Sequence, residues 1–164
     1  MKLLRKLRLS AWNYHAGIPM LPITSFHFNP EQIDSTKMER ETSEQVEVRA
    51  ESFFLEEQSS AEENHYVFAY RIKIRNLGNC TVQLLDRHWI ITDSNGEVNE
   101  VRGDGVVGEQ PVLAPGEDFE YTSGCHLKTE MGTMHGSYGM IDENGESLEV
   151  PIPCFTLSVP GIIN

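Results

Sequence analysis

The sequence has no apolar run approaching the roughly 20 residues that a membrane-spanning helix requires. Its first residues are basic and rich in leucine, but no uncharged apolar segment of adequate length follows, which argues against a secretory signal. Cysteine is scarce as well: Cys80, Cys125 and Cys154 form no Cys-x-x-Cys pair. Three such thiols are typical of small apolar residues in a reducing compartment, although spacing alone leaves a disulfide open. We therefore expect a cytoplasmic protein without a membrane span.

Positive charge is scarce outside the first 37 residues. Residues 1–37 carry five basic and two acidic side chains, whereas residues 38–164 carry eight basic and 23 acidic ones, within a net charge of −12. Nucleic acids and anionic lipid surfaces are bound through basic patches that release counterions. The acidic body of the chain should repel both, so we expect no nucleic-acid partner.

The first 37 residues also differ in pattern from the rest. Three leucines within the first seven residues would share one face of a short helix surrounded by lysine and arginine. One interpretation is an amphipathic helix that touches a surface, and the other is an unstructured extension upstream of a later start such as Met38. We expect residues 1–37 to be a separate N-terminal extension and residues 38–164 to form one domain.

No convincing helical period occurs between residues 46 and 159, where apolar and polar residues alternate in short runs. The clearest run is 68–75, and Asn95-Gly96, Pro115-Gly116 and Asn144-Gly145 supply turns between runs. Asp86-Arg87 interrupts one alternation, which predicts a β-bulge or a change of sheet. Seven or eight short strands with frequent turns predict an all-β, antiparallel β-sandwich of the immunoglobulin or fibronectin type III kind.

Proline and aromatic residues refine this prediction. Pro151 and Pro153 cannot donate to a strand ladder, so the last strand should be an edge or a strand switch. The aromatic residues of the alternating runs should form the sandwich core: Trp89, Tyr66, Phe68, Tyr70, Phe119, Tyr121, Tyr138 and Phe155.

The only nucleotide-like motif is Gly103-Asp104-Gly105-Val106-Val107-Gly108, which fits G-x-G-x-x-G. In dinucleotide folds that motif opens a helix, but β-branched valines and Pro111 predict that no helix follows here. One interpretation is a backbone nest for a phosphate, assisted by Arg102 and opposed by nearby acids unless Mg²⁺ bridges them. The alternative is a mobile loop between strands whose glycines permit positive φ. The candidate phosphate-binding residues are Arg102, Gly103, Asp104, Gly105, Val106, Val107 and Gly108.

Metal-binding and catalytic constellations are missing from the sequence. Its histidines, such as His88 and His135, follow no recognised ligand spacing, so we predict no metal site and no cofactor. Cys125 and His126 are neighbours on an expected strand, where adjacent side chains point to opposite faces and cannot pair as nucleophile and base. We expect a protein that is not an enzyme. Exposed sheet edges make protein partners or a homodimer natural.

Several ordered segments resemble the ApaG family, over roughly residues 44–160. They include His88-Trp89-Ile90-Ile91-Thr92 and the glycine motif, and the full set is 66–70, 74–78, 82–85, 88–92, 101–108, 110–111, 113–117, 121–124 and 140–145. The resemblance implies a fibronectin type III-like sandwich and a role in divalent-cation physiology, namely cobalt resistance and magnesium efflux, without established catalysis. It also implies partner recognition, and associates pyrophosphate or GTP binding with the glycine loop.

Overall fold

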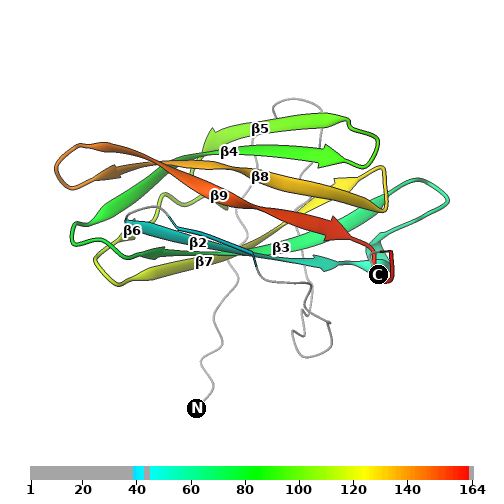
Figure 1. Cartoon of the computed structure of the whole chain (residues 1–164), viewed down its shortest axis with the longest axis horizontal. Helices are drawn as coiled ribbons and strands as arrows, with labels where there is room; N and C mark the ends of the chain where they lie inside the picture. The colour runs from blue at the N-terminus through cyan, green and yellow to red at the C-terminus, as the bar shows by residue number, and fades with distance from the viewer. Residues whose placement is uncertain (1–38, 43–44, 163–164) are drawn as a thin grey trace, which may run out of the picture.

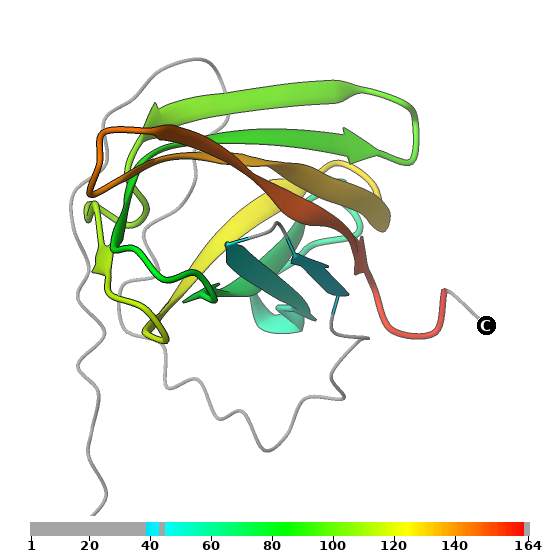
Figure 2. The ribbon, with the colours of Figure 1, turned by 60° about the vertical axis from the view of Figure 1, so that its left-hand side comes forward.

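The computed structural model describes residues 39–42 and 45–162, which form two antiparallel sheets packed face to face (Figures 1 and 2). The predicted extension 1–37 lies outside the described residues. The first sheet has the order β1-β2-β3-β7, and the second has the order β5-β4-β8-β9 with β6 also paired to β4. The strands are β1 (Glu39–Thr42), β2 (Val46–Phe54), β3 (Tyr66–Asn76), β4 (Val82–Asp93), β5 (Val98–Asp104), β6 (Val112–Leu113), β7 (Asp118–Leu127), β8 (Met131–Asp142) and β9 (Ser147–Ser158). This architecture confirms the predicted all-β sandwich.

The turns, the bulge and the edge strand that the sequence predicted can each be located in the structure. Gly96 and Gly145 have positive φ in the turns that join β4 to β5 and β8 to β9, as the two Asn-Gly pairs predict. The predicted bulge lies between Leu84 and Asp86, where β4 shifts its register against β8. β9 is an edge of the second sheet, in agreement with its two prolines. A short 3-10 helix, η2 (Glu56–Gln58), follows β2, and within the described residues no helix is long and apolar enough to cross a membrane.

The core lies between the two sheets and contains the predicted aromatic residues. Trp89 is 1% exposed and meets Tyr70 edge-on, with ring centroids 5.4 Å apart. Tyr138 and Phe155 contact the same indole at 6.3 and 6.0 Å. Phe119 is half-buried and packs on this core. All three cysteines are free thiols, Cys125 buried and Cys154 exposed.

A hydrogen bond between two buried tyrosine hydroxyls links the two sheets through the core. The Tyr121 and Tyr138 hydroxyls lie 2.5 Å apart, and one donates to the other. Burial raises the pKa of the Tyr70, Tyr121 and Tyr138 hydroxyls above the usual value of 10.0, because the charged phenolate would lose its hydration. Burial likewise raises the pKa of the Cys125 thiol from 9.0 to about 12.

These shifts predict a loss of stability in alkali. Each group keeps its proton when folded but releases it when unfolded, so the unfolded state binds fewer protons above the unfolded pKa. The stability is complete below pH 9.0, the unfolded pKa of Cys125, and falls above it, first through Cys125 and from pH 10.0 through the tyrosines. The expected slope is about 1.4 kcal/mol per pH unit for each group that titrates. Urea unfolding across this range, with tyrosinate absorbance, measures it. A free energy of unfolding that stays constant well above pH 10.0 would contradict the burial of these groups.

Candidate functional site

The glycine motif forms a loop that leaves the second sheet between β5 and β6. Both strands pair with β4, so the loop is an excursion from an otherwise continuous edge. Its first end is held by Gly105 N–H, which donates to Leu85 O at 2.8 Å. Its second end is held by Leu84 N–H, which donates to Pro111 O at 3.0 Å. The loop therefore has both ends fixed on the bulged part of β4.

Inside the loop the chain makes a two-residue turn. Val106 and Glu109 exchange two backbone hydrogen bonds, of 2.8 and 2.9 Å. The two residues between them have positive φ, 45° at Val107 and 78° at Gly108. Positive φ at both central positions is the requirement of a type I′ turn, which favours Asn-Gly. No helix follows the motif, as predicted, and the dinucleotide arrangement is absent from this loop.

Val107 is an unusual residue for this position. A β-branched side chain at positive φ is strained, at a cost on the order of 1–3 kcal/mol. The side chain packs partly against the core beside Val106, which is 1% exposed. Such strain persists only where the surroundings impose it, and it concentrates at functional positions. Val107 therefore marks the turn as a candidate binding feature.

Arg87 of β4 holds the loop through hydrogen bonds to its backbone. The sequence did not identify Arg87 as a residue of the site. Its Nη1 donates to Asp104 O at 2.9 Å and to Gly105 O at 2.7 Å. Gly103 lies opposite Arg87 in the strand register, and a Cβ there would meet Nη1 and Nη2 at 3.2 Å. Gln110 adds a bond from Nε2 to Leu85 O at 2.7 Å. The first glycine thus makes room for the guanidinium that fixes the loop.

The orientation of the backbone bears on the phosphate hypothesis. An anion nest needs several N–H groups that converge on one point. The amides of Gly105, Val106 and Glu109 instead donate to backbone carbonyls, and two loop carbonyls turn toward Arg87. Arg102 lies on the opposite, outer face of β5, 69% exposed and 3.7 Å from Glu100. Four of the seven predicted residues, Gly103 to Val106, therefore make the internal contacts that hold the loop together.

The remaining loop residues form a surface at the outer end of the turn. We call it the loop-tip surface, and it consists of Val107, Gly108, Glu109, Gln110, Pro111 and Val112. Val112 is 57% exposed, which is high for a large apolar residue, and Gly108, Glu109 and Gln110 are also exposed. The exposed Val112, the half-buried Val107 and the exposed Glu109 carboxylate suit contact with another protein surface.

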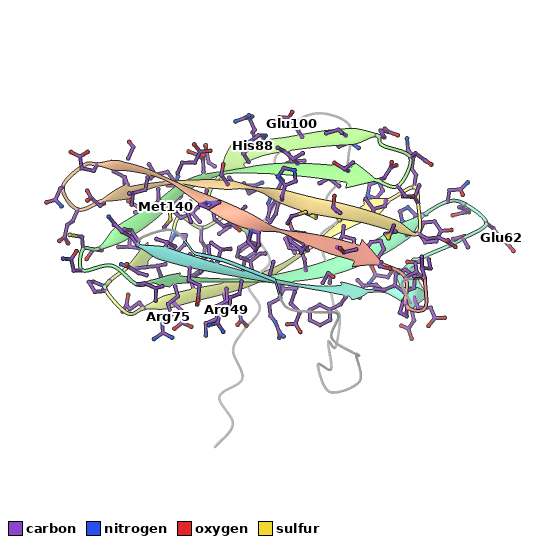
Figure 3. All side chains as sticks on the ribbon, in the orientation of Figure 1. Arg49, Glu62, Arg75, His88, Glu100 and Met140 are labelled. Atoms are coloured by element: carbon purple, nitrogen blue, oxygen red, sulfur yellow. The ribbon has the colours of Figure 1, made fainter. Side chains whose placement is uncertain are left out.

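The histidines and the nucleophile candidates lie apart. His88 Nε2 is 2.8 Å from a Glu100 carboxylate oxygen on the outer face of the second sheet (Figure 3). The rings of His65 and His126 lie 5.3 Å apart. Among the residues that the structure describes, no group of three or more His, Cys, Asp and Glu side chains is arranged to hold a metal ion. Cys125 pairs with Phe68 and His126 with Val67, so their side chains point to opposite faces as predicted.

Known proteins resemble this chain over most of the described region. A sequence model of the ApaG domain matches residues 56–142. "Protein ApaG" of Azoarcus sp. is 51% identical over 127 residues, which is 77% of this chain and 100% of the relative. "Protein ApaG" of Paramagnetospirillum magneticum is 53% identical and covers 75% of this chain and 95% of its own.

Solved structures agree. A crystal structure of a Bordetella pertussis protein described as ApaA is 52% identical, with a TM-score of 0.69 over 71% of this chain and 94% of that one. A second X-ray structure, of a structural-genomics target, is 45% identical with a TM-score of 0.70, over 73% and 91%. The matched domain, the identity above one half across nearly whole relatives, and the shared sandwich lead to one conclusion: this chain belongs to the ApaG domain family.

Proposed function

We propose that this chain is a non-catalytic binding module that engages a protein partner through the loop-tip surface. The observation that carries the proposal is the strained type I′ turn at Val107, in a loop that Arg87 holds at Asp104 and Gly105 and that leads to the exposed Val112. A rigid, preformed loop loses little conformational entropy when it binds. Residues at the centre of such contacts are apolar, with polar neighbours at the rim.

The partner proposal is tested with charged substitutions at the loop tip. Val107→Asp and Val112→Asp each introduce a carboxylate, and aspartate tolerates the positive φ of position 107. Ile162→Asp is the matched control, because Ile162 is 41% exposed and lines a hollow with Ser94 and Lys128, outside the loop tip. Each folded variant is used to capture proteins from a lysate of the source organism, with quantitative mass spectrometry.

We expect a protein retained by the wild type and by Ile162→Asp to be lost at least tenfold with both loop-tip variants. The same set of captured proteins with all four chains would contradict the proposal. Turnover of nucleotides or diphosphates by metal-replete protein, abolished by one point substitution, would instead make the chain an enzyme.

Phosphate binding is the second candidate function, and one observation favours it. The Arg87 guanidinium contacts the backbone of the glycine loop at Asp104 and Gly105. Guanidinium groups are the preferred hydrogen-bond donors to phosphate in proteins. Calorimetry with pyrophosphate and with GTP, each with and without Mg²⁺, decides this candidate. Binding that is lost in both Gly105→Val and Arg87→Met would support it, whereas no heat, or unchanged affinity in both variants, would exclude the loop as the site.

The family resemblance supports two further parts of the proposal. We place the protein in the cytoplasm and connect it with divalent-cation homeostasis, including cobalt resistance and magnesium efflux. In this proposal the partner protein makes the connection. Equilibrium dialysis of the purified chain with Co²⁺ and Mg²⁺ distinguishes this indirect link from direct binding of the cations by the chain. Stoichiometric binding would show a direct link.

A further inference from the structure

One edge of the second sheet is open in the part of the chain that the structure describes. A strand edge offers unpaired N–H and C=O groups, and natural proteins guard such edges with prolines, charges or bulges. β9 carries Pro151 and Pro153. β7 carries the acidic side chains Asp118 and Glu120 near one end, and charges are one of these guards. β5 contains no proline, and it pairs with β4 alone (Figure 1).

The register identifies which backbone groups of β5 point outward. Asp93 N–H donates to Glu97 O at 3.1 Å, and Gly105 N–H donates to Leu85 O at 2.8 Å. Both bonds continue the β4–β5 register, in which hydrogen-bonded and non-hydrogen-bonded pairs alternate. The odd-numbered residues of β5 therefore bond to β4. The N–H and C=O groups of the even-numbered residues, including Glu100 and Arg102, point away from β4 toward the open edge.

Charge favours one register in which this edge could pair with itself. An antiparallel pair with a twofold axis at Val101 sets Glu100 opposite Arg102 of the second copy, and Arg102 opposite Glu100. Each of these residues then exchanges two backbone hydrogen bonds with its counterpart, because its N–H and C=O groups point away from β4. An axis at Glu100 or at Arg102 would instead set like charges opposite each other, which is destabilising. Both side chains are exposed, at 56% and 69%.

Arg87 limits how far such pairing extends. Its guanidinium already occupies the carbonyl of Asp104, and the chain turns away at Gly105. A twofold axis at Gly103, which would set Arg102 opposite Asp104, is therefore disfavoured. The pairing that remains spans residues 99–103.

We propose that β5 is a self-association edge that pairs antiparallel with β5 of a second copy across a twofold axis at Val101. The second sheet of one copy and the second sheet of the other then form one continuous sheet. Val101, half-buried against the core, meets its symmetry mate, and the Glu100–Arg102 pairs lie on the outer face near His88, where Figure 3 places Glu100. Because few residues take part, the dimer is weak and depends on concentration.

Charge reversal tests the register in the full chain. Glu100→Arg sets arginine opposite arginine twice, and Arg102→Glu sets acid opposite acid twice. The double variant E100R/R102E restores opposite charges with the same composition. Sedimentation velocity over a concentration series measures the dissociation constant. We expect each single change to weaken the dimer at least tenfold and the double variant to recover to within about threefold of wild type. A monomer at every concentration, or single variants that dimerise like wild type, would overturn the proposal, as would failure of the double variant to recover.

A cysteine scan gives a second readout that does not depend on charge. Val101→Cys, in a Cys154→Ser background, sets two thiols opposite each other in a non-hydrogen-bonded pair, with Cα atoms about 4.5 Å apart. This spacing lies within the range of a disulfide. Val98→Cys is the control, because position 98 would meet position 104 and not itself. We expect a cross-linked dimer on non-reducing gels for the first variant only. Equal cross-linking of both, or of neither, would overturn the twofold axis. This test leaves the loop-tip surface unchanged, so its outcome is independent of the proposed function.

Discussion

Replacing Gly136 with alanine should cost about 4 kcal/mol of folding free energy, which is exceptional for the addition of one methyl group. Gly136 lies in β8 directly opposite Trp89 of β4. A Cβ there would lie 1.9 Å from the backbone oxygen of His88, far inside van der Waals contact. Backbone atoms cannot rotate away as a side chain would, so β4 and β8 must separate. Those two strands carry Trp89 and Tyr138, and the core would open with them.

Gly103→Ala is the matched control for Gly136→Ala. It also adds a methyl group in a strand of the second sheet, but its nearest neighbours are Nη1 and Nη2 of Arg87, the far end of a flexible side chain, at 3.2 Å. We expect a cost of about 1 kcal/mol or less for Gly103→Ala. Urea unfolding followed by tryptophan fluorescence gives both values. Similar costs for the two variants would show that β4 and β8 are not in the close contact described above.

Gly105→Ala should destabilise the chain by about 3 kcal/mol and distort the glycine loop. Gly105 has a φ of 58°, which alanine adopts only with strain. The new Cβ would also lie 2.3 Å from the backbone oxygen of Glu109. That oxygen accepts the hydrogen bond from Val106 N–H that closes the type I′ turn. The substitution therefore opens the turn as well as straining it.

Gly116→Ala separates the two contributions. Gly116 has a similar φ of 83°, but a Cβ there would meet nothing within 4 Å. Only the conformational strain remains, so we expect a cost of about 1 kcal/mol. If Gly105→Ala and Gly116→Ala proved equally stable by urea unfolding, the close approach of Glu109 to Gly105 would be refuted.

The strands and the core were predictable because they depend on local patterns. Alternation of period two in 68–75 specifies which side chains face inward, and the structure buries Phe68, Tyr70, Ile72 and Ile74. The Asn-Gly pairs specify their turns through positive φ, and Asp86-Arg87 marked the bulge. β7 and β8 run through Gly124, Gly132, Gly136 and Gly139, which interrupt the apolar pattern without ending the strands.

The construction of the loop was not predictable from the sequence. Arg87 reaches Asp104 and Gly105 across 17 and 18 residues of sequence, and only the β4–β5 register brings them together. Val107 contradicts the preference of its turn, so turn propensities could not identify a type I′ turn there. The G-x-G-x-x-G spacing suggested phosphate chemistry, whereas Gly103 and Gly105 permit close contacts within the loop. Long-range contacts thus determine what the same glycines do.

Amide hydrogen exchange at Gly105, Val106 and Glu109, with and without pyrophosphate and Mg²⁺, tests the central claim most directly. That claim is that the loop is a preformed surface whose amides are committed to internal hydrogen bonds. It predicts slow exchange at all three amides, comparable to those of β4, and the same rates when pyrophosphate is present. Fast exchange in the free protein that slows on addition of pyrophosphate would contradict it, and would show an open loop whose amides bind the anion.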